Sequence, residues 1–324
     1  MPDTPATQAV YPQSRSQAPG VGFPLARIVT LFSLSCGTVL GVALAPWRGK
    51  GTGENALFRS LWAHLLPGDV VLADRFYDSH CQLALLQQRG VDSVFRPHSN
   101  RRIDFRTGQR LGPGDHVVRW TKPRRPEWLD PEAYGALPDT LAIREVRVTV
   151  SCKGFRTQRL MVATTLVDPA ATTAQDLADL YWARWQAELD LRSLKPVLQM
   201  DLLRGKTPSM VRKEIWAHLL AYNLLRTVMA QAALQYGVLP WHLSFKGALQ
   251  TLNAFRDHLL FASGERLRAL CQELLKAIAV HRVGNRPGRY EPRARKRRPK
   301  PYPLLNKPRL QARNELLRQA AAYA

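Results

Sequence analysis

The sequence predicts an α/β fold with a β-rich middle, a helical second half and a basic tail. Three observations lead to this prediction. Short apolar runs alternate with helical patterns up to residue 96, strand-like runs fill residues 97–166, and helical patterns dominate from about residue 173 to 280. Strands that alternate with helices are typical of a largely parallel sheet, which we expect in the first part of the chain.

Composition bounds the size of the fold and the kind of partner. The chain has 324 residues, 45% of them hydrophobic, which suffices for one large domain or two smaller ones. The chain contains 47 Lys and Arg but only 25 Asp and Glu, which gives a net charge of +22 and a pI near 10.6. Such an excess favours a polyanion, nucleic acid before an anionic membrane, over a basic surface with no ligand. The four scattered cysteines are typical of a reduced, intracellular protein.

No membrane partner is expected. The first twenty residues are polar and rich in proline, unlike a secretory signal. Residues 28–46 carry no charge and approach the length of a membrane span, but "SLSCGT" interrupts them and β-branched residues flank it. Two buried strands joined by a turn fit this segment better.

A helix, a strand, a second helix and a second strand follow in order. An amphipathic helix is predicted from about residue 54 to 66, where Pro67 and Gly68 end it. The preceding "GKGTG" lacks the spacing of a phosphate-binding loop, which excludes that type of nucleotide site. The apolar strand 70–73 ends at Asp74, and a helix over about 79–89 leads to the strand "VDSVFR". Sites in such sheets lie at the carboxyl ends of strands, where Asp74 is placed.

The rest of the chain changes character twice. Residues 97–166 hold the strand-like runs "DHVVRW", "LAIREVRVTV" and "FRTQRLMVATTL" with no helix between them, and six arginines precede or separate these runs: Arg101, Arg102, Arg106, Arg110, Arg124 and Arg125. Helices then extend from about Thr173 to Val280. From Arg282 to Arg313 there are twelve Lys or Arg, six Pro and one acid, which predicts an extended or disordered basic tail.

The segment "DLYWARWQAELDLRSLK" carries four polar side chains at intervals of three, four and seven residues: Tyr181, Arg184, Glu188 and Lys195. At about 100° per residue, a regular helix places all four within an arc of about 60°. The bland interpretation is a helical ion pair between Arg184 and Glu188, a packed tyrosine and a solvated lysine. On the same interpretation, Asp74 only caps the turn that follows its strand.

The functional interpretation combines the two acids. In a basic protein, Asp74 and Glu188 suit a divalent metal ion that acts on phosphodiesters, since Mg²⁺ prefers a few carboxylate oxygens and takes other ligands from the substrate. Tyr181, Arg184 and Lys195 would then hold DNA phosphates beside the metal. Spacing alone leaves both interpretations open.

A family resemblance favours the functional one. The pattern Tyr181-x2-Arg184-x3-Glu188-x6-Lys195 resembles the Y-R-E-K signature of the DDE transposases typified by bacterial insertion sequence 4. "LADRFYDSH" resembles the block that holds that family's second catalytic aspartate, here Asp74. "GFPLARIVTLFSLSCGTVL", "GKGTGENALFRSL", "VRKEIWAHLLAYNLLR" and "LSFKGALQTL" also resemble family blocks, so the similarity extends from residue 1 to about 255.

The resemblance implies a fold and an activity. The fold would be an RNase H-like core in two parts, 1–96 and 167–281, interrupted by a β-rich insertion over 97–166 and followed by a flexible tail over 282–324. The activity would be metal-dependent cleavage and strand transfer of double-stranded DNA at transposon ends and targets, within a self-associated synaptic complex. Asp74 and Glu188 would be catalytic and bind Mg²⁺ or Mn²⁺, while Tyr181, Arg184 and Lys195 would bind DNA. A prokaryotic cytoplasmic, nucleoid-associated location follows.

The same resemblance raises a question about the first catalytic aspartate. In relatives, a stretch that resembles "MPDTPATQAVYPQ" follows this aspartate within a few residues, and here it begins at Met1. We therefore expect the first aspartate and its strand to be missing, and this chain to have little or no cleavage activity by itself. Asp3 is a poor substitute, because Pro2 and Pro5 predict an extended, mobile terminus around it. The alternative functions are a non-catalytic DNA-binding remnant that regulates a full-length transposase and, less consistent with the signature, a basic RNA- or ribosome-associated protein.

Overall fold

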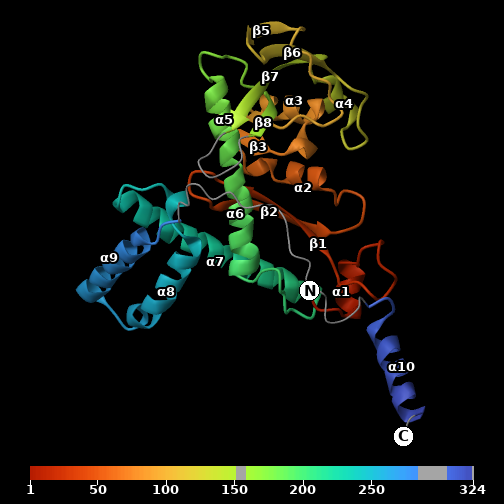
Figure 1. Cartoon of the computed structure of the whole chain (residues 1–324), viewed down its shortest axis with the longest axis vertical. Helices are drawn as coiled ribbons and strands as arrows, with labels where there is room; N and C mark the ends of the chain where they lie inside the picture. The colour runs from red at the N-terminus through yellow and green to blue at the C-terminus, as the bar shows by residue number, and fades with distance from the viewer. Residues whose placement is uncertain (151–157, 284–304, 323–324) are drawn as a thin grey trace. The chain divides into compact units, whose positions relative to one another are not determined.

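The computed structural model describes residues 1–150, 158–283 and 305–322 (Figure 1). These residues form two compact units, each described below by itself. Residues 61–189 make up the sheet unit, and residues 1–60, 190–283 and 305–322 make up the helical unit.

The sheet unit contains a six-stranded sheet in the order β3-β4-β8-β7-β6-β5. Strand β3 (Val70–Ala73) runs parallel to β4 (Asp92–Phe95), and the helix α3 (His80–Gln88) connects them. The bounds of these three elements agree with the sequence prediction. Ser79 caps α3 with its side chain, which accepts a hydrogen bond from the Gln82 N–H.

The strand–helix–strand segment forms the parallel pair that was expected, but the sheet that contains it is not largely parallel, because β3 and β4 are the only parallel pair among its described strands. The other strands are antiparallel: β5 (Gln109–Gly112), β6 (Asp115–Thr121), β7 (Thr140–Val150) and β8 (Gln158–Thr164). Parallel neighbours need long crossover connections, whereas β5 and β6 are joined by a short turn. A five-residue helix, α4 (Pro131–Gly135), lies between β6 and β7 where no helix was expected. The sheet is therefore mixed.

Helix α5 (Ala174–Ala183) packs against this sheet (Figure 1). Its buried face carries Leu177, Ala178 and Tyr181. These side chains pack with apolar residues of β4, β7 and β8: Val94, Val146, Val148 and Val162. Helix α6 (Trp185–Arg192) follows directly along the chain.

The helical unit begins with α1 (Pro5–Val10) and the hairpin of β1 (Ala26–Phe32) and β2 (Val39–Pro46). This hairpin confirms the prediction of two strands in the charge-free segment. The remaining elements are helical: α2 (Glu54–Ser60), a π-helical turn (Ser193–Val197), α7 (Pro208–Gln235), α8 (Phe245–Leu260), α9 (Gly264–Val280) and α10 (Arg309–Ala322). Helix α2 is shorter than predicted, and a separate 3₁₀ turn follows it at Trp62–His64.

Both ends of the helical unit differ from the expectation of extended chain. Asp3 precedes α1, and its Oδ1 accepts a hydrogen bond from the Gln8 side chain at 2.8 Å. Thr4 caps α1 in a reciprocal pair with the buried Thr7. At the other end, α10 occupies part of the expected tail, because the sequence after Pro308 contains good helix formers and no further proline. Residues 284–304 of that tail lie outside the described part of the chain.

A buried polar network ties the hairpin of the helical unit to α7. The Tyr222 hydroxyl donates to the Gly37 carbonyl at 2.6 Å, and Arg226 Nε donates to the Tyr222 oxygen at 3.0 Å. The Arg226 guanidinium also forms an ion pair with Asp190, and both side chains are buried. In the described part of the chain, no helix is long and apolar enough to cross a membrane.

Replacing Gly37 with Ala should destabilise this unit strongly. Gly37 has a φ of +75°, and an added Cβ would lie 2.9 Å from Cζ of Arg226, which its ion pair holds in place. Backbone strain and overpacking each cost about 1–3 kcal/mol, so we expect a loss of about 2–4 kcal/mol in the free energy of unfolding measured with urea. Gly51→Ala is the matched control, because Gly51 has a φ of +74° and nothing within 4 Å. An equal loss in both variants would contradict the steric argument.

Candidate active site

Asp74 lies where β3 leaves the sheet. Its carboxylate is exposed, and Oδ1 accepts a hydrogen bond from the Arg75 N–H at 2.7 Å, which caps the 3₁₀ turn Arg75–Tyr77. In the parallel register of β3 and β4, Ala73 pairs with Phe95. The next residue of each strand, Asp74 and Arg96, therefore leaves the sheet at the same edge.

Tyr181 connects α5 to that edge. Its side chain is only 5% exposed. Burial raises the pKa of the Tyr181 phenol. The positive charges of Arg184 and Arg96 lower this pKa, whereas the negative charge of Asp74 raises it further. The phenol is thus within electrostatic reach of one carboxylate and two guanidinium groups. Tyr181 also lies in one apolar cluster with Val94 of β4 and Leu72 of β3, the two strands that Arg96 and Asp74 follow.

Arg184 joins the edge to Glu188. Its guanidinium carbon lies 5.6 Å from the centre of the Tyr181 ring, and its Nη2 donates to Glu188 Oε1 at 2.9 Å. The Arg184 Nε is buried and, among the described residues, has no hydrogen-bond acceptor. The Glu188 side chain remains 44% exposed. An exposed carboxylate beside a buried, unpaired donor is an arrangement that can receive a ligand with oxygen atoms.

The four signature residues do not lie on one regular helix. Helix α5 ends at Ala183, α6 begins at Trp185, and the segment that contains Lys195 is π-helical. Pro196 has no N–H to continue the α-helical pattern, and the Leu198 N–H instead donates five residues back to the Ser193 carbonyl at 3.0 Å. The predicted arc of about 60° assumed a regular α-helix with equal rotation per residue, and this assumption is wrong for the segment that contains Lys195. Lys195 is exposed and belongs to the helical unit.

The sequence analysis missed Arg96 and an open cavity lined by Arg75, the residue that follows Asp74 in the chain. Arg96 could have been found, because it follows the strand "VDSVF" just as Asp74 follows "VVLA". The cavity has a volume of about 670 Å³, and its lining residues come from two segments: Arg75, Phe76, Asp78, His98, Asn100, Arg101 and Arg102. Burial raises the pKa of the Asp78 carboxyl, although the His98 N–H that donates to it opposes the rise. Three guanidinium groups make the cavity suitable for anionic oxygens.

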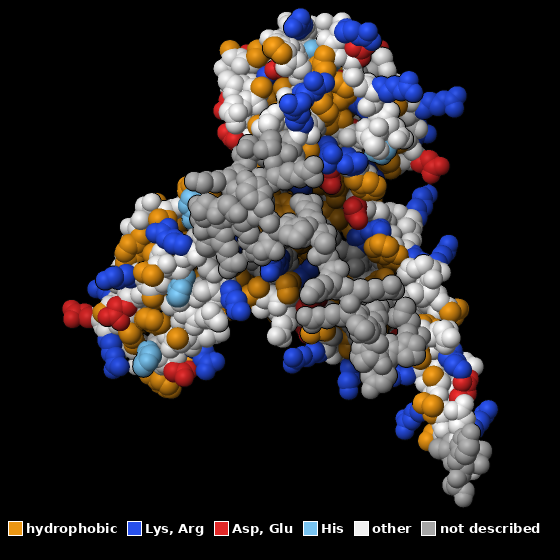
Figure 2. Space-filling model, in the orientation of Figure 1, with side chains coloured by type: hydrophobic (Ala, Val, Ile, Leu, Met, Phe, Trp, Pro, Cys, Tyr) orange, Lys and Arg blue, Asp and Glu red, His pale blue; other side chains and the backbone are white. Residues whose placement is uncertain are grey.

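The donor chemistry of the site suits a hard metal ion. Asp74 and Glu188 both present exposed carboxylate oxygens, the ligands that Mg²⁺ and Mn²⁺ prefer. In residues 1–150, 158–283 and 305–322, no group of three His, Cys, Asp or Glu side chains is arranged to hold a metal ion. Figure 2 shows many Lys and Arg side chains on the visible face of the sheet unit, at the top of the view.

Sequence comparisons find a matching family model and similar proteins. Residues 6–224 match the family model described as "Transposase DDE domain". The chain is 29% identical over 319 residues to transposase InsG for insertion sequence element IS4 from Escherichia coli (strain K12), which covers 94% of this chain and 67% of that protein. It is 40% identical over 57 residues to the putative transposase InsL for insertion sequence element IS186A of the same organism, 18% of this chain and 15% of that one.

A solved structure is also similar. The piggyBac transposase synaptic complex with hairpin DNA matches with a TM-score of 0.40 and 13% identity, over 82% of this chain and 49% of that chain. This chain spans about two thirds of the length of the IS4 relative. The match to the family model covers well over half of the chain, and the IS4 relative aligns with nearly all of it. The chain therefore belongs to the DDE transposases, in the family of the insertion sequence IS4 transposase.

Proposed function

We propose that the site of this chain serves metal-dependent cleavage and strand transfer of double-stranded DNA at transposon ends, in a catalytically complete form of the protein that supplies a third carboxylate. The observation that carries the proposal is the packing of Tyr181 with Leu72 and Val94, close to where Asp74 and Arg96 leave the sheet. Arg184 lies beside Tyr181 and pairs with Glu188. Two carboxylates for a metal ion and several cations for phosphates are the groups that phosphodiester chemistry requires.

We propose an RNase H-like core as the fold that presents these groups. Three features support this assignment: the parallel pair β3 and β4 joined by α3, the antiparallel hairpin of β1 and β2, and a helix that carries the glutamate after a β-rich region. On this assignment, 1–96 and 167–281 are the two parts of the core and 97–166 is the insertion. The outer edge of β3 is unpaired within its own sheet, so a further parallel strand added there would end beside Asp74.

Asp74 and Glu188 would hold Mg²⁺ or Mn²⁺. The metal ion supplies Lewis-acid stabilisation of the oxygens at the scissile phosphate. Beside these carboxylates, the guanidinium groups of Arg96 and Arg184 would bind phosphate oxygens and neutralise their charge. The buried Tyr181 holds the Arg184 guanidinium over its ring, and Lys195 contacts a phosphate further along the strand.

The test is a nicking assay on duplex DNA that carries transposon ends, with Mg²⁺, with Mn²⁺ and with a chelator. Nicking that requires the metal supports the proposal, and Asp74→Asn should remove it. Binding of Mn²⁺, followed by electron paramagnetic resonance, tests the carboxylates independently of cleavage. Mn²⁺ binding that is unchanged in Asp74→Asn and in Glu188→Gln would overturn their assignment as ligands.

The alternative function is a non-catalytic regulator that occupies transposon ends. The specific observation in its favour is the Arg184–Glu188 ion pair, which engages the glutamate as an ordinary helical pair would. Selective binding to terminal repeats without metal-dependent nicking would favour this alternative. A self-associated synaptic complex and a nucleoid-associated location belong to the proposal for either function, because both need DNA ends.

DNA affinity should fall steeply and linearly with salt on logarithmic axes, because each neutralised phosphate releases counterions. Residues 282–313 carry twelve Lys or Arg and one acid, half of the excess charge of the chain. Deleting residues 284–324 should therefore weaken binding to all sequences alike and flatten the salt slope, measured by fluorescence anisotropy. Changing the six Lys and Arg of residues 293–300 to Gln tests the charge without the deletion. A salt slope unchanged in both variants would contradict a role for this segment.

A further inference from the structure

Arg144 is an unusual residue for the interior of a sheet. It lies in β7 and is only 1% exposed. Its partner in the ladder to β6 is Val117, so Asp115, two residues away, lies diagonally opposite on the same face. Arg144 Nε donates to Asp115 Oδ1 at 2.9 Å, and Nη2 donates to Oδ2 at 2.6 Å. A bidentate pair of this kind fixes the guanidinium in one plane and compensates its charge.

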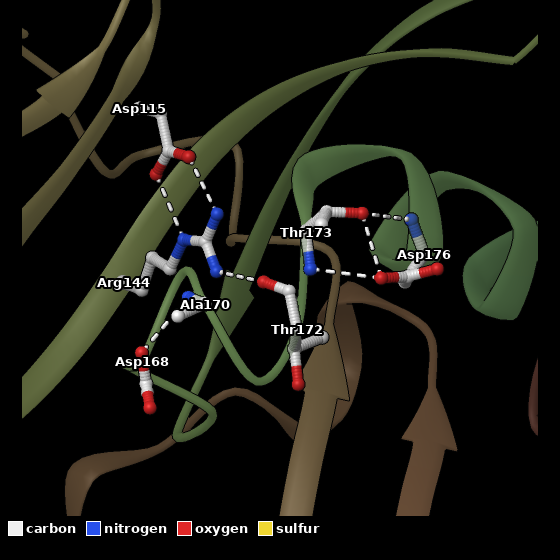
Figure 3. A network of polar contacts seen from close by, with 7 residues as sticks. All are labelled: Asp115, Arg144, Asp168, Ala170, Thr172, Thr173 and Asp176. Atoms are coloured by element: carbon white, nitrogen blue, oxygen red, sulfur yellow. Dashed lines mark hydrogen bonds and ion pairs between the residues drawn. The ribbon is translucent and has the colours of Figure 1, made fainter.

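The third donor of Arg144 reaches the start of helix α5. Its Nη1 donates to the Thr172 carbonyl at 2.5 Å, as Figure 3 shows. The next residue, Thr173, is the cap of α5 and forms a reciprocal pair with Asp176. The turn before it is closed by Asp168, whose carboxylate accepts from the Ala170 N–H at 2.8 Å. The first turn of α5 is thus tied to β6 and β7 by directional hydrogen bonds.

Apolar packing alone does not fix α5 along its own axis. Leu177, Ala178 and Tyr181 contact a surface of valine side chains, and hydrophobic contact has no direction. A shift by one residue moves a helix by about 1.5 Å. Misplacement of a reacting group by about 1 Å can cost about 100-fold in rate. The positive charge of Arg144 alone would be unfavourable near the N-terminal end of α5, which is itself positive. The carboxylate of Asp115 neutralises this charge.

We propose that Arg144, held by Asp115, is a positioning residue that sets where Tyr181 and Arg184 lie relative to Asp74. Arg144 contacts neither of them and acts through the position of α5, whose last buried residue is Tyr181. Only the effect of this positioning on DNA cleavage rests on the proposed function. The placement of Tyr181 can be measured without any activity.

The experiment labels the full chain with 3-fluorotyrosine and assigns the Tyr181 signal with Tyr181→Phe. In Arg144→Met, we expect the fluorine resonance of Tyr181 to shift or broaden, because the phenol loses its burial. The signals of Tyr134 and Tyr222 should stay in place. Arg147→Met is the matched control, because Arg147 lies on the same strand with an exposed side chain and also loses one charge.

Two more variants keep the proposal falsifiable if Arg144→Met fails to fold. Arg144→Lys keeps the positive charge but loses the bidentate pair with Asp115. Asp115→Asn keeps the shape of the side chain but loses its negative charge. Each variant should shift the Tyr181 signal more than Arg147→Met does. A Tyr181 signal that stays at its wild-type position in the folded variants would overturn the proposal. If the signal moves while Mn²⁺ binding is unaffected by Asp74→Asn and Glu188→Gln, the positioning role stands and the proposed function fails.

Discussion

In a catalytically complete form of the protein, Glu188→Gln is expected to lower metal-dependent nicking of transposon-end DNA by about 100-fold to 1,000-fold or more, and to leave DNA binding near the wild-type level. The change removes a carboxylate ligand but keeps the size of the side chain, so the electrostatic stabilisation that it supports is lost. Stability should hardly change. The Arg184–Glu188 pair is an i, i+4 pair on a partly exposed surface, and such pairs contribute about 0.3–0.5 kcal/mol.

Two further variants separate chemistry from structure. Arg184→Ala should weaken binding to the DNA end as well as nicking, because its guanidinium is proposed to contact phosphate. Asp179→Asn is the matched control, since Asp179 is an exposed acid on α5, nine residues before Glu188. If Glu188→Gln and Arg184→Ala both lowered the free energy of unfolding by the same amount and affected DNA binding equally, a purely structural ion pair would be the better explanation.

Local elements of this fold were predictable because their signals are local. Strand β3 is a four-residue apolar run between Gly68-Asp69 and Asp74, and α3 begins after Ser79 and ends before Gly90. The sheet as a whole was not predictable in this way. Val94 of β4 pairs with Thr164 of β8, seventy residues later, and no short-range pattern specifies that pairing. This pairing makes the sheet mixed rather than parallel.

The site shows the same division. Asp74 was placed by the rule that sites lie at the carboxyl ends of strands, and the pKa influences on Tyr181 agree with its proximity to Arg184. Arg96 was missed although it directly follows its strand, and the register between β3 and β4 then shows that it leaves the sheet at the same edge as Asp74. The helical arc was wrong at Lys195, where Pro196 converts the helix to π geometry. A single proline in "RSLKPV" was the signal that equal rotation per residue would fail.

The largest loss of stability is expected from breaking the buried ion pair of the helical unit. Asp190 is 2% exposed and Arg226 is 6% exposed. Burial raises the pKa of the Asp190 carboxyl, and the positive charge of Arg226 opposes this rise. Removing one partner leaves an uncompensated buried charge, which costs about 3–5 kcal/mol. Asp190→Ala should therefore lower the free energy of unfolding in urea by about that amount. Arg226→Met should have the same effect at a pH at which Asp190 remains ionised.

The double variant Asp190→Leu/Arg226→Met should recover most of this loss, because apolar replacements of a whole buried pair are often neutral. Arg256→Met provides the control at an exposed pair with Asp257, where a change below about 1 kcal/mol is expected. Single variants that lost less than about 1 kcal/mol would show that the pair is not decisive. Asp190 lies two residues after Glu188 in α6, so the single variants should also lose nicking. If the ion pair affects nicking only through folding, the double variant should restore it. Nicking that stays lost after stability returns would instead mean that the pair sets the position of the helix that carries Glu188.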